Sequence, residues 1–290
     1  MNSKTKNDLE NLRSKNSFIG DVWANFKRWL IKFFRSPHTV IMNLIQPILF
    51  LFLFVEVFGN IVSNPISGVL GGEVEYVTFL LPAISIQVAV MTGMASGIGL
   101  VRDIEEWIFE KVMVSPMSTT AVFIGKTTSE LVRIAAQIAI ILALGIALGA
   151  KISTGILGML GIIGVGLLFS IVFISLTTSI SMITRDQEAM QAILMPIMFP
   201  LLFLSSAFLP LKILPDWIQT FGKFNPITYG VDAARAIALG KDVMTTIEFN
   251  ALSGMWNTVV PAISVLLIYI IILGGLAIYT IKKGTSSEAK

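Results

Sequence analysis

The sequence predicts an all-α membrane protein with six transmembrane helices. Of its 290 residues, 54% are hydrophobic and only 13% are charged, whereas soluble domains carry about 25% charged residues. The mean hydropathy is +0.81. The apolar residues gather into runs of roughly 20, which is the length that an α-helix needs to cross a bilayer and about twice that of a barrel strand. We therefore expect helices as the spanning elements.

The predicted spans form one transmembrane domain over residues 40–281. Short polar segments separate them, because each charged side chain would cost roughly 2.5–3.5 kcal/mol in the hydrocarbon. Glycines at Gly93-x-x-x-Gly97 favour close helix packing, either within the bundle or at a dimer face. The expected spans are residues 40–61, 77–101, 129–150, 155–183, 190–211 and 259–281.

The basic residues orient the chain. Fifteen of the 21 Lys and Arg residues fall in segments on one side of the predicted spans, five fall on the other, and Arg133 lies inside a span. Because Lys and Arg accumulate on the cytoplasmic side, we expect both termini in the cytoplasm and the protein in the plasma membrane. Residues 1–20 and 282–290 are expected to be cytoplasmic tails. The first is expected to be disordered, since it is polar and lacks the apolar core of a signal peptide.

An interfacial amphipathic helix is predicted at residues 21–36. Its aromatic side chains share one face at helical spacing, and its basic side chains lie on or beside the other. This pattern is typical of a helix in the headgroup layer; the alternative is an ordinary amphipathic helix packed on protein. The aromatic residues expected at the interface are Trp23, Phe26, Trp29 and Phe33.

A charged island, Val101–Lys126, separates the second and third predicted spans. So many charges exclude it from the hydrocarbon and place it at a membrane surface. Asp103–Val114 has the pattern of a short helix, with apolar and acidic side chains on different faces. Pro116 ends that helix, and Ser118 or Thr119 can cap the next one. A short charged helix between two spans is suited to receive a push from a soluble partner; the alternative is a merely solvated loop.

The segment 210–257 on the opposite side predicts two short helices. Asp216 marks the start of the first helix. Asn225 caps the second helix, Pro226 takes its first position, and the helix continues through residues 227–239. The segment is too apolar for a water-exposed domain, so we expect these helices to dip into the outer leaflet between spans 5 and 6.

Two motifs carry a resemblance. In the island, Glu105 and Glu110 precede Met113-Val114-Ser115-Pro116-Met117-Ser118 and then Gly125-Lys126; on the other side, Phe224-Asn225-Pro226-Ile227-Thr228-Tyr229 precedes Asp232 and Arg235. The chain resembles permeases of ABC type-2 exporters, and the second motif resembles their daunorubicin-resistance-type drug-exporter branch. One position departs from the pattern, since Trp107-Ile108 stands where the family usually has Gly-Thr.

The resemblance implies the membrane subunit of an exporter. It implies two permeases side by side, expected to be a homodimer, and two separate ABC ATPase subunits that hold ATP and Mg, with no cofactor on this chain. The cargo implied is hydrophobic and drug-like or lipid-like; a polysaccharide or glycolipid is the alternative. The island then becomes a coupling helix, and its expected ATPase-coupling residues are Arg102, Asp103, Glu105, Glu106, Trp107, Glu110, Lys111, Ser115 and Pro116.

Two further groups of residues are candidates. The outer-segment motif residues are Asn225, Pro226, Tyr229, Asp232 and Arg235. Of these, Asp232 and Arg235 are three residues apart on one helix, so we expect a structural ion pair rather than a cargo contact. An apolar cargo path is suggested by Phe50, Phe54, Glu56 and Met91, for which lipid exposure or core packing is the alternative.

Several function classes are disfavoured. The chain has no Cys and one His, so we expect neither a metal site nor catalytic residues, and no nucleic-acid partner. Gly125-Lys126-Thr127 is not a phosphate loop, because Thr120 stands where that loop needs a glycine. An ion-coupled secondary transporter would need carboxylates near the membrane midplane, whereas Glu56 and Glu188 fall near span ends. A non-transporting scaffold stays open.

Overall fold

The structure is a computed structural model that describes residues 18–35, 37–70, 74–107, 117–246 and 252–287. All regular elements in these ranges are helical, as the predicted fold class requires. In chain order they are α2 (Phe18–Phe34), α3 (Pro37–Leu70), α4 (Tyr76–Glu105), α6 (Thr119–Ala147), α7 (Gly155–Thr184), α8 (Gln187–Phe203), the 3-10 helix η1 (Leu211–Ile213), α9 (Asp216–Phe224), α10 (Pro226–Leu239) and α11 (Trp256–Ser287).

Five of these helices are long and apolar enough to cross a membrane. They correspond to five of the six predicted spans, and the chain is accordingly a multi-pass membrane protein. The spanning segments are Ile41–Gly59 in α3, Tyr76–Glu105 in α4, Thr120–Ala147 in α6, Gly155–Thr184 in α7 and Trp256–Lys283 in α11.

The span expected at residues 190–211 is the exception. Helix α8 has 17 residues and ends at Phe203, so it rises roughly 25 Å, less than the ~30 Å hydrocarbon thickness. Its end is stabilised from elsewhere, because Asn225 Nδ2 donates to the carbonyl oxygens of Leu201 at 2.6 Å and Leu204 at 3.1 Å. A helix can end inside protein when another side chain takes its last carbonyls in this way.

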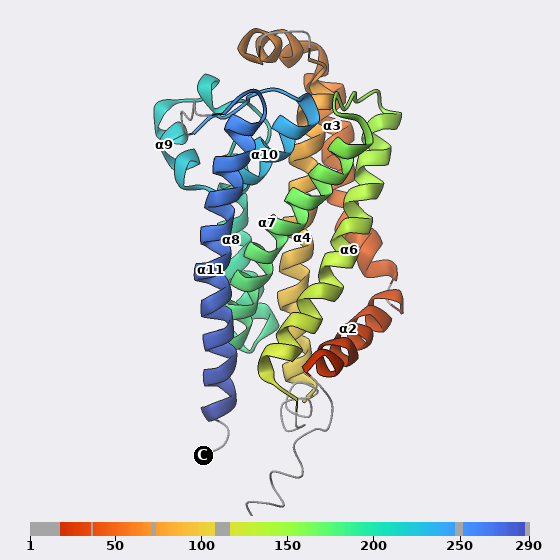
Figure 1. Ribbon diagram of the computed structural model, residues 1–290, viewed down its shortest axis with the longest axis vertical. Helices are drawn as coiled ribbons and strands as arrows, with labels where there is room; N and C mark the ends of the chain where they lie inside the picture. The colour runs from red at the N-terminus through yellow and green to blue at the C-terminus, as the bar shows by residue number, and fades with distance from the viewer. Residues whose placement is uncertain (1–17, 36, 71–73, 108–116, 247–251, 288–290) are drawn as a thin grey trace, which may run out of the picture.

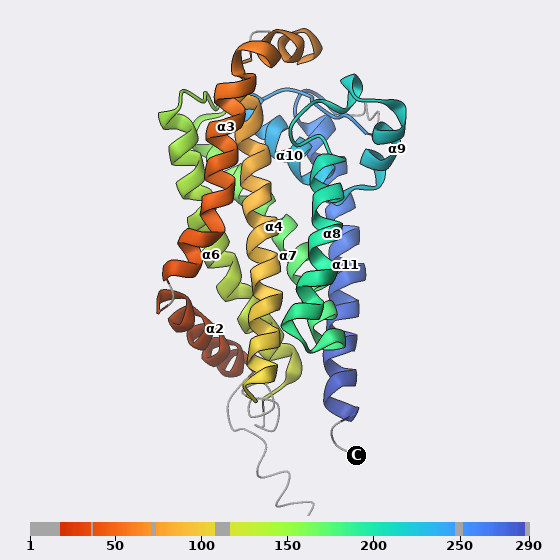
Figure 2. The same ribbon diagram turned by 180° about the vertical axis from the view of Figure 1, so that it is seen from behind.

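Helix α4 forms the centre of the bundle. In an apolar 18-residue stretch of α4, 94% of the residues are buried, against 17% in such stretches of α3 and α11. Helices α3, α6, α7, α8 and α10 surround α4 (Figures 1 and 2). Gly97 lets α7 approach, since a Cβ there would lie 2.7 Å from Thr177 Cβ. Thr177 Oγ1 donates to the Gly93 carbonyl at 2.9 Å. The small-residue pair Gly93 and Gly97 therefore serves packing within the chain.

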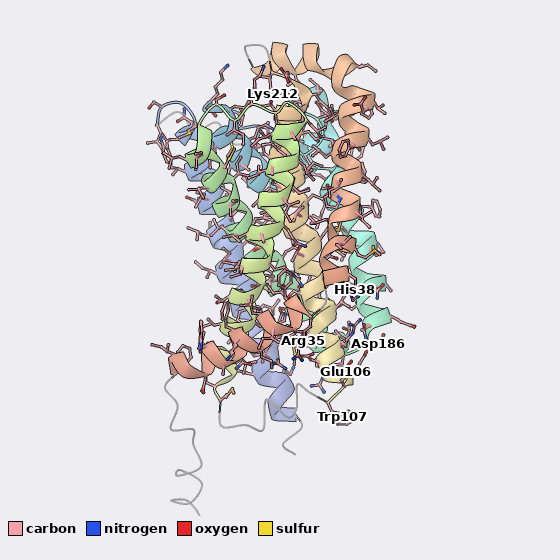
Figure 3. All side chains as sticks on the ribbon, turned by 90° about the vertical axis from the view of Figure 1, so that its right-hand side faces the viewer. Arg35, His38, Glu106, Trp107, Asp186 and Lys212 are labelled. Atoms are coloured by element: carbon pink, nitrogen blue, oxygen red, sulfur yellow. The ribbon has the colours of Figure 1, made fainter. Side chains whose placement is uncertain are left out.

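The two ends of the bundle carry different parts of the chain. Helix α2, the last turn of α4 and the last turns of α11 lie at one end, which we call the α2 end; η1, α9 and α10 lie at the other, the α10 end (Figures 1 and 2). Figure 3 shows the same division, with Lys212 at the α10 end and Arg35, Glu106 and Asp186 at the α2 end. The described parts of the charged island, residues 101–107 and 117–126, thus lie at the opposite end from η1, α9 and α10.

Several helix bounds differ from the expected ones. Helix α2 begins at Phe18, inside the expected tail, and ends at Phe34 rather than residue 36. Helix α11 continues to Ser287, so most of the expected C-terminal tail is helical. Residues 1–17 and 288–290 lie outside the described residues. Both outer helices, α9 and α10, are present at the expected positions.

Candidate functional site

A buried carboxylate on α4 holds the α2 end together. Asp103 is 1% exposed. Lys32 Nζ donates to Asp103 Oδ1 at 2.6 Å, and Arg28 Nη2 lies 3.3 Å from Oδ2. Because a buried carboxylate is stable only when paired, these two contacts dock α2 on the last turn of α4.

Trp29 lies inside a group of cations from two helices. Its ring is 7% exposed, and the charged groups of Arg28, Lys32 and Lys126 lie 5.1, 4.9 and 5.4 Å from the ring centroid. Lys126 is also buried and donates to Ser96 Oγ at 2.7 Å. Cation–π contacts of this kind gain strength when water is excluded, so Trp29 fastens α2 to both α4 and α6.

Helix α6 crosses α2 closely at Gly125, beside Lys126 of the island. A Cβ on Gly125 would lie 2.6 Å from the Val22 carbonyl oxygen and 2.7 Å from Asn25 Cβ. Asn25 is itself buried, and its Nδ2 donates to Asp21 O at 3.0 Å. Only glycine admits the backbone of α2 this closely. Helix α6 begins nearby, where Ser118 Oγ accepts from Ala121 N at 3.1 Å, as expected of a cap.

The end of α4 differs from the predicted coupling helix. No separate helix begins at Asp103; Arg102–Glu105 form the last turn of α4, and Glu106 and Trp107 form a turn after it. The helix continues because its buried face extends through Asp103 and Ile104. Trp107 then ends it with a φ of 58°, a left-handed conformation that favours glycine. Glu110, Lys111, Ser115 and Pro116 lie outside the described residues, so a coupling helix there stays a prediction.

Glu105 connects the end of α4 to the start of α8. Its Oε1 accepts from the Gln187 backbone N–H at 3.1 Å, and its Oε2 accepts from Gln187 Nε2. Asp186 caps the same helix end, accepting from Ala189 N at 2.6 Å. Carboxylates favour helix N-termini, where backbone N–H groups are unpaired. These contacts join the last turn of α4 to the first turn of α8.

The four aromatic residues expected at the membrane interface divide between two environments. Trp23 is 62% exposed, and its ring stacks on half-buried Phe26 at 5.3 Å. Trp29, in contrast, packs inside the protein, and half-buried Phe33 lines a cavity described below. Helix α2 therefore combines the two alternatives, with one part packed on the bundle and another presented to the surroundings.

The outer-segment motif closes the α10 end through its first residues. Asn225 Oδ1 accepts from Ile227 N at 3.0 Å, which caps α10, while its Nδ2 takes the carbonyls at the end of α8. Pro226 occupies the first turn of α10, as expected. Tyr229 donates its hydroxyl to the Lys223 carbonyl at 2.6 Å, at the end of α9. One short motif thus joins three helix ends.

Asp232 and Arg235 form the buried part of the motif. Arg235 Nη1 lies 3.6 Å from Asp232 Oδ1, and the two side chains are 1% and 0% exposed. Asp232 also accepts from Ser206 Oγ at 2.6 Å and Thr245 Oγ1 at 2.5 Å. Burial raises the pKa of Asp232. It lowers the pKa of Arg235 to about 10, so the guanidinium stays charged at neutral pH.

Arg235 uses its remaining donors on backbone carbonyls. Its Nε donates to Phe79 O at 3.2 Å, and its Nη2 donates to Ser206 O at 3.0 Å and Ala207 O at 3.1 Å. The guanidinium carbon lies 3.6 Å from the Phe79 ring centroid. The pair therefore ties α10 to α4 and to the chain after α8.

The proposed cargo-path residues lie mainly on one side of the bundle. Phe54 stacks on Phe208 at 4.6 Å, and Phe50 lies 6.1 Å from the same ring. Met91 on α4 is half-buried and packs on the same apolar core. Glu56 is exposed on α3. The structure brings the two Phe residues together around Phe208, which the sequence had not singled out.

The connections between distant segments were missed by sequence reasoning. Nothing local indicated that Glu105 would pair with Gln187, or that Ser206 and Thr245 would complete the site of Asp232. The only available signal was chemical, since a carboxylate in an apolar run needs donors from somewhere. Among the described residues, no group of three or more His, Cys, Asp or Glu is arranged to hold a metal.

Known proteins are similar to this chain in sequence. A family model described as ABC-2 type transporter matches residues 20–239, from α2 to the end of α10. The daunorubicin resistance ABC transporter permease protein DrrB1 of Streptomyces coeruleorubidus is 25% identical over 213 residues, 73% of each chain. The probable doxorubicin resistance ABC transporter permease protein DrrC of Mycobacterium tuberculosis is 24% identical over 230 residues, 79% of this chain and 80% of the relative.

A third relative has a broader name. The putative transport permease ycf38 of Cyanophora paradoxa is 28% identical over 255 residues, 81% of this chain and 82% of its own. The family match covers most of the chain, and the described residues of the two motifs that carried the resemblance lie at opposite ends of a helical membrane bundle. The chain belongs to the ABC-2 type transporter family and is a permease of that family.

Proposed function

We propose that this permease moves a hydrophobic drug-like or lipid-like substrate outward, using ATP that a separate subunit hydrolyses. The observation that carries the proposal is the assembly at the α2 end. There Asp103 ties α2 to α4, Lys126 and Gly125 tie α2 to α6, and Glu105 ties α4 to α8. A force applied to the turn after α4 reaches four helices at once.

The partner that applies this force is an ABC ATPase, which membership of the family implies. We propose two copies of it, each holding ATP and Mg and contacting one permease of a homodimer. ATP binding closes the ATPase pair and moves the turn at Glu106 and Trp107, both of which are exposed. The packed helices transmit the movement and open an outward path between the two permeases.

The distribution of charge supports this orientation and energy source. Fifteen of the 21 basic residues fall in the sequence segments expected on the same side of the spans as α2, so we place the α2 end and both termini in the cytoplasm of a plasma-membrane protein. The buried ionisable side chains of the described residues cluster towards the two ends, as with Asp103 and Lys126 at one and Asp232 and Arg235 at the other. An ion-coupled carrier would instead use buried carboxylates near the midplane.

The substrate class rests on the aromatic surface and on the relatives. Rings of α3 and α8 meet around Phe208, including Phe54 at 4.6 Å and Phe203 at 5.2 Å. Flat apolar molecules bind well to such rings. Two relatives are named for daunorubicin or doxorubicin resistance, and we propose amphipathic aromatic drugs as the first cargo to test.

The test uses the permease reconstituted in vesicles with the ATPase subunit that copurifies with it. Amphipathic drugs, fluorescent lipids and glycolipids are screened for stimulation of ATP hydrolysis and for ATP-dependent movement across the membrane. The proposal expects a drug or lipid to do both. Substrate movement driven by a proton or sodium gradient without ATP would refute the proposal. Stimulation by a glycolipid alone would instead support the alternative cargo, a polysaccharide or glycolipid.

A further inference from the structure

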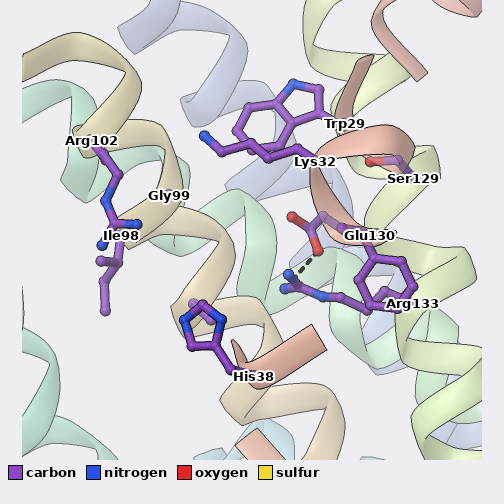
Figure 4. Close-up of a pocket in the computed structure, with 11 residues that line it drawn as sticks. Trp29, Lys32, His38, Ile98, Gly99, Arg102, Ser129, Glu130 and Arg133 are labelled. Carbon is purple, nitrogen blue, oxygen red and sulfur yellow. Dashed lines mark ion pairs between the residues drawn. The ribbon is translucent and has the colours of Figure 1, made fainter. Parts of the chain in front are cut away.

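A cavity of about 300 Å³ opens at the α2 end, where α2, α4, α6 and the start of α3 meet (Figure 4). Lys32 lines it from α2, His38 from α3, Arg102 from α4 and Arg133 from α6. Four segments that are distant in the sequence therefore present basic side chains to one space. None of the proposed transport steps uses this cavity.

The charge of the lining is positive. Its cations are Lys32, Arg102 and Arg133, and its acid is Glu130, which pairs with Arg133 at 2.6 Å. Lys32 is matched by Asp103 from outside the lining. Within the described part of the chain, Arg102 forms neither an ion pair nor a side-chain hydrogen bond. The buried Nε of Arg133 also lacks a hydrogen-bond partner. Both groups are donors suited to an anion.

Apart from His38 and Ser129, the rest of the lining is apolar. Phe33, Ile98 and Gly99 contribute carbon surface beside the charged groups. Just beyond His38, helix α3 exposes Ile41 at 60% and Met42 at 64%. A ligand that fits both parts has an anionic head and hydrocarbon chains.

The position of the cavity favours a membrane lipid over a dissolved anion. It adjoins α2, whose exposed Trp23 and basic residues have the pattern of a headgroup-layer helix, and it lies where the spanning segment of α3 begins. Basic pockets between membrane helices bind anionic headgroups at this depth.

We propose that the cavity binds the phosphate headgroup of an anionic phospholipid, with the acyl chains along the exposed start of α3. Arg102 and Arg133 contact the phosphate, and Gly99 leaves room for it. The bound headgroup bridges α2, α3, α4 and α6, and so stabilises the docking of α2. This inference depends only on the membrane location of the chain, and its failure would leave the proposed transport function untouched.

The test titrates the purified full-length permease with phosphatidylglycerol or phosphatidylcholine and counts bound lipids by native mass spectrometry. Arg102→Gln removes the cation without an ion pair, and we expect about fivefold weaker phosphatidylglycerol binding. Gly99→Leu fills the cavity without changing its charge. A Cβ there would lie 3.8 Å from Trp29 Cζ3, an ordinary van der Waals contact, so the start of the new side chain finds open space. We expect this variant to lose the tightest-bound lipid.

Lys27→Gln and Arg35→Gln are the matched controls, since both cations are exposed on or beside α2 and neither lines the cavity. The proposal expects them to bind phosphatidylglycerol as the unaltered chain does. Equal loss in the controls would show diffuse surface attraction and overturn the proposal. Unchanged binding in Arg102→Gln and Gly99→Leu would also overturn it. Displacement of the lipid by millimolar glycerol phosphate would assign the site to a free phosphate instead.

Discussion

The docking of α2 on α4 is predicted to depend on one carboxylate, Asp103. Asp103→Asn keeps the size of the side chain and removes its charge. The carboxylate is 2% exposed, whereas its partners Lys32 and Arg28 are 43% and 36% exposed. Breaking a fully buried pair costs about 3–5 kcal/mol, and an exposed pair contributes about 1 or less. Since water reaches both cations, we expect a loss of about 1–2 kcal/mol in the free energy of α2 docking.

Hydrogen–deuterium exchange of α2 measures this loss directly. An opening reaction that becomes easier by about 1–2 kcal/mol exchanges roughly 5- to 30-fold faster. The amides of α2 should therefore exchange faster in Asp103→Asn, while those of α10, which lies at the opposite end of the bundle, serve as an internal reference.

The control for this variant is Glu106→Gln, which removes the same charge from the exposed turn after α4. It should leave the exchange of α2 unchanged. Equal exchange of α2 in Asp103→Asn and in Glu106→Gln would refute the view that the buried ion pairs hold this helix in place.

Three further predictions concern thermal stability, measured as the Tm of the purified protein. Trp107→Gly should raise stability by about 1 kcal/mol, since glycine adopts the positive φ of this position without strain; a lower Tm would contradict this. Gly125→Ala should cost about 1–3 kcal/mol, because its Cβ would lie 2.6 Å from the Val22 carbonyl oxygen. The control Gly164→Ala should cost nothing, since no atom lies within 4 Å of its Cβ. Equal losses of stability in the two variants would count against a tight crossing of α2 and α6. Arg235→Met should cost about 3–5 kcal/mol by leaving Asp232 buried and unpaired, and adding Asp232→Asn should recover part of it; no recovery would show that the pair does not act as a unit.

The spans were largely predictable because hydropathy is a local property. The expected span 77–101 lies within α4 (Tyr76–Glu105), and 155–183 agrees closely with α7 (Gly155–Thr184). The span 190–211 was wrong in its second half. Its residues are apolar enough to continue, but Asn225 offers the backbone a different end, and no local pattern reveals a hydrogen bond to a residue so far along the chain.

The candidate sites were predictable to the extent that their contacts are local. The cap at Asn225 and the pair of Asp232 with Arg235 follow from spacing within one helix. Asp103 was expected on an exposed coupling helix, yet it is buried. Sequence reasoning missed this burial because the partner of Asp103, Lys32, is 71 residues away. The aromatic face of α2 indicated that Trp29 faces away from water, but amphipathicity alone cannot distinguish lipid from protein.

In the proposed mechanism, the acidic turn and island after α4 transmit the movement of the ATPase to the membrane helices. The most direct measurement compares ATP hydrolysis and substrate movement in the same vesicles for the triple variant Glu105→Lys, Glu106→Lys and Glu110→Lys. We predict that substrate movement is lost while ATP hydrolysis continues. Asp216→Lys, a charge reversal at the exposed start of α9 on the α10 end, should change neither. Substrate movement at the unaltered rate in the triple variant would contradict the account.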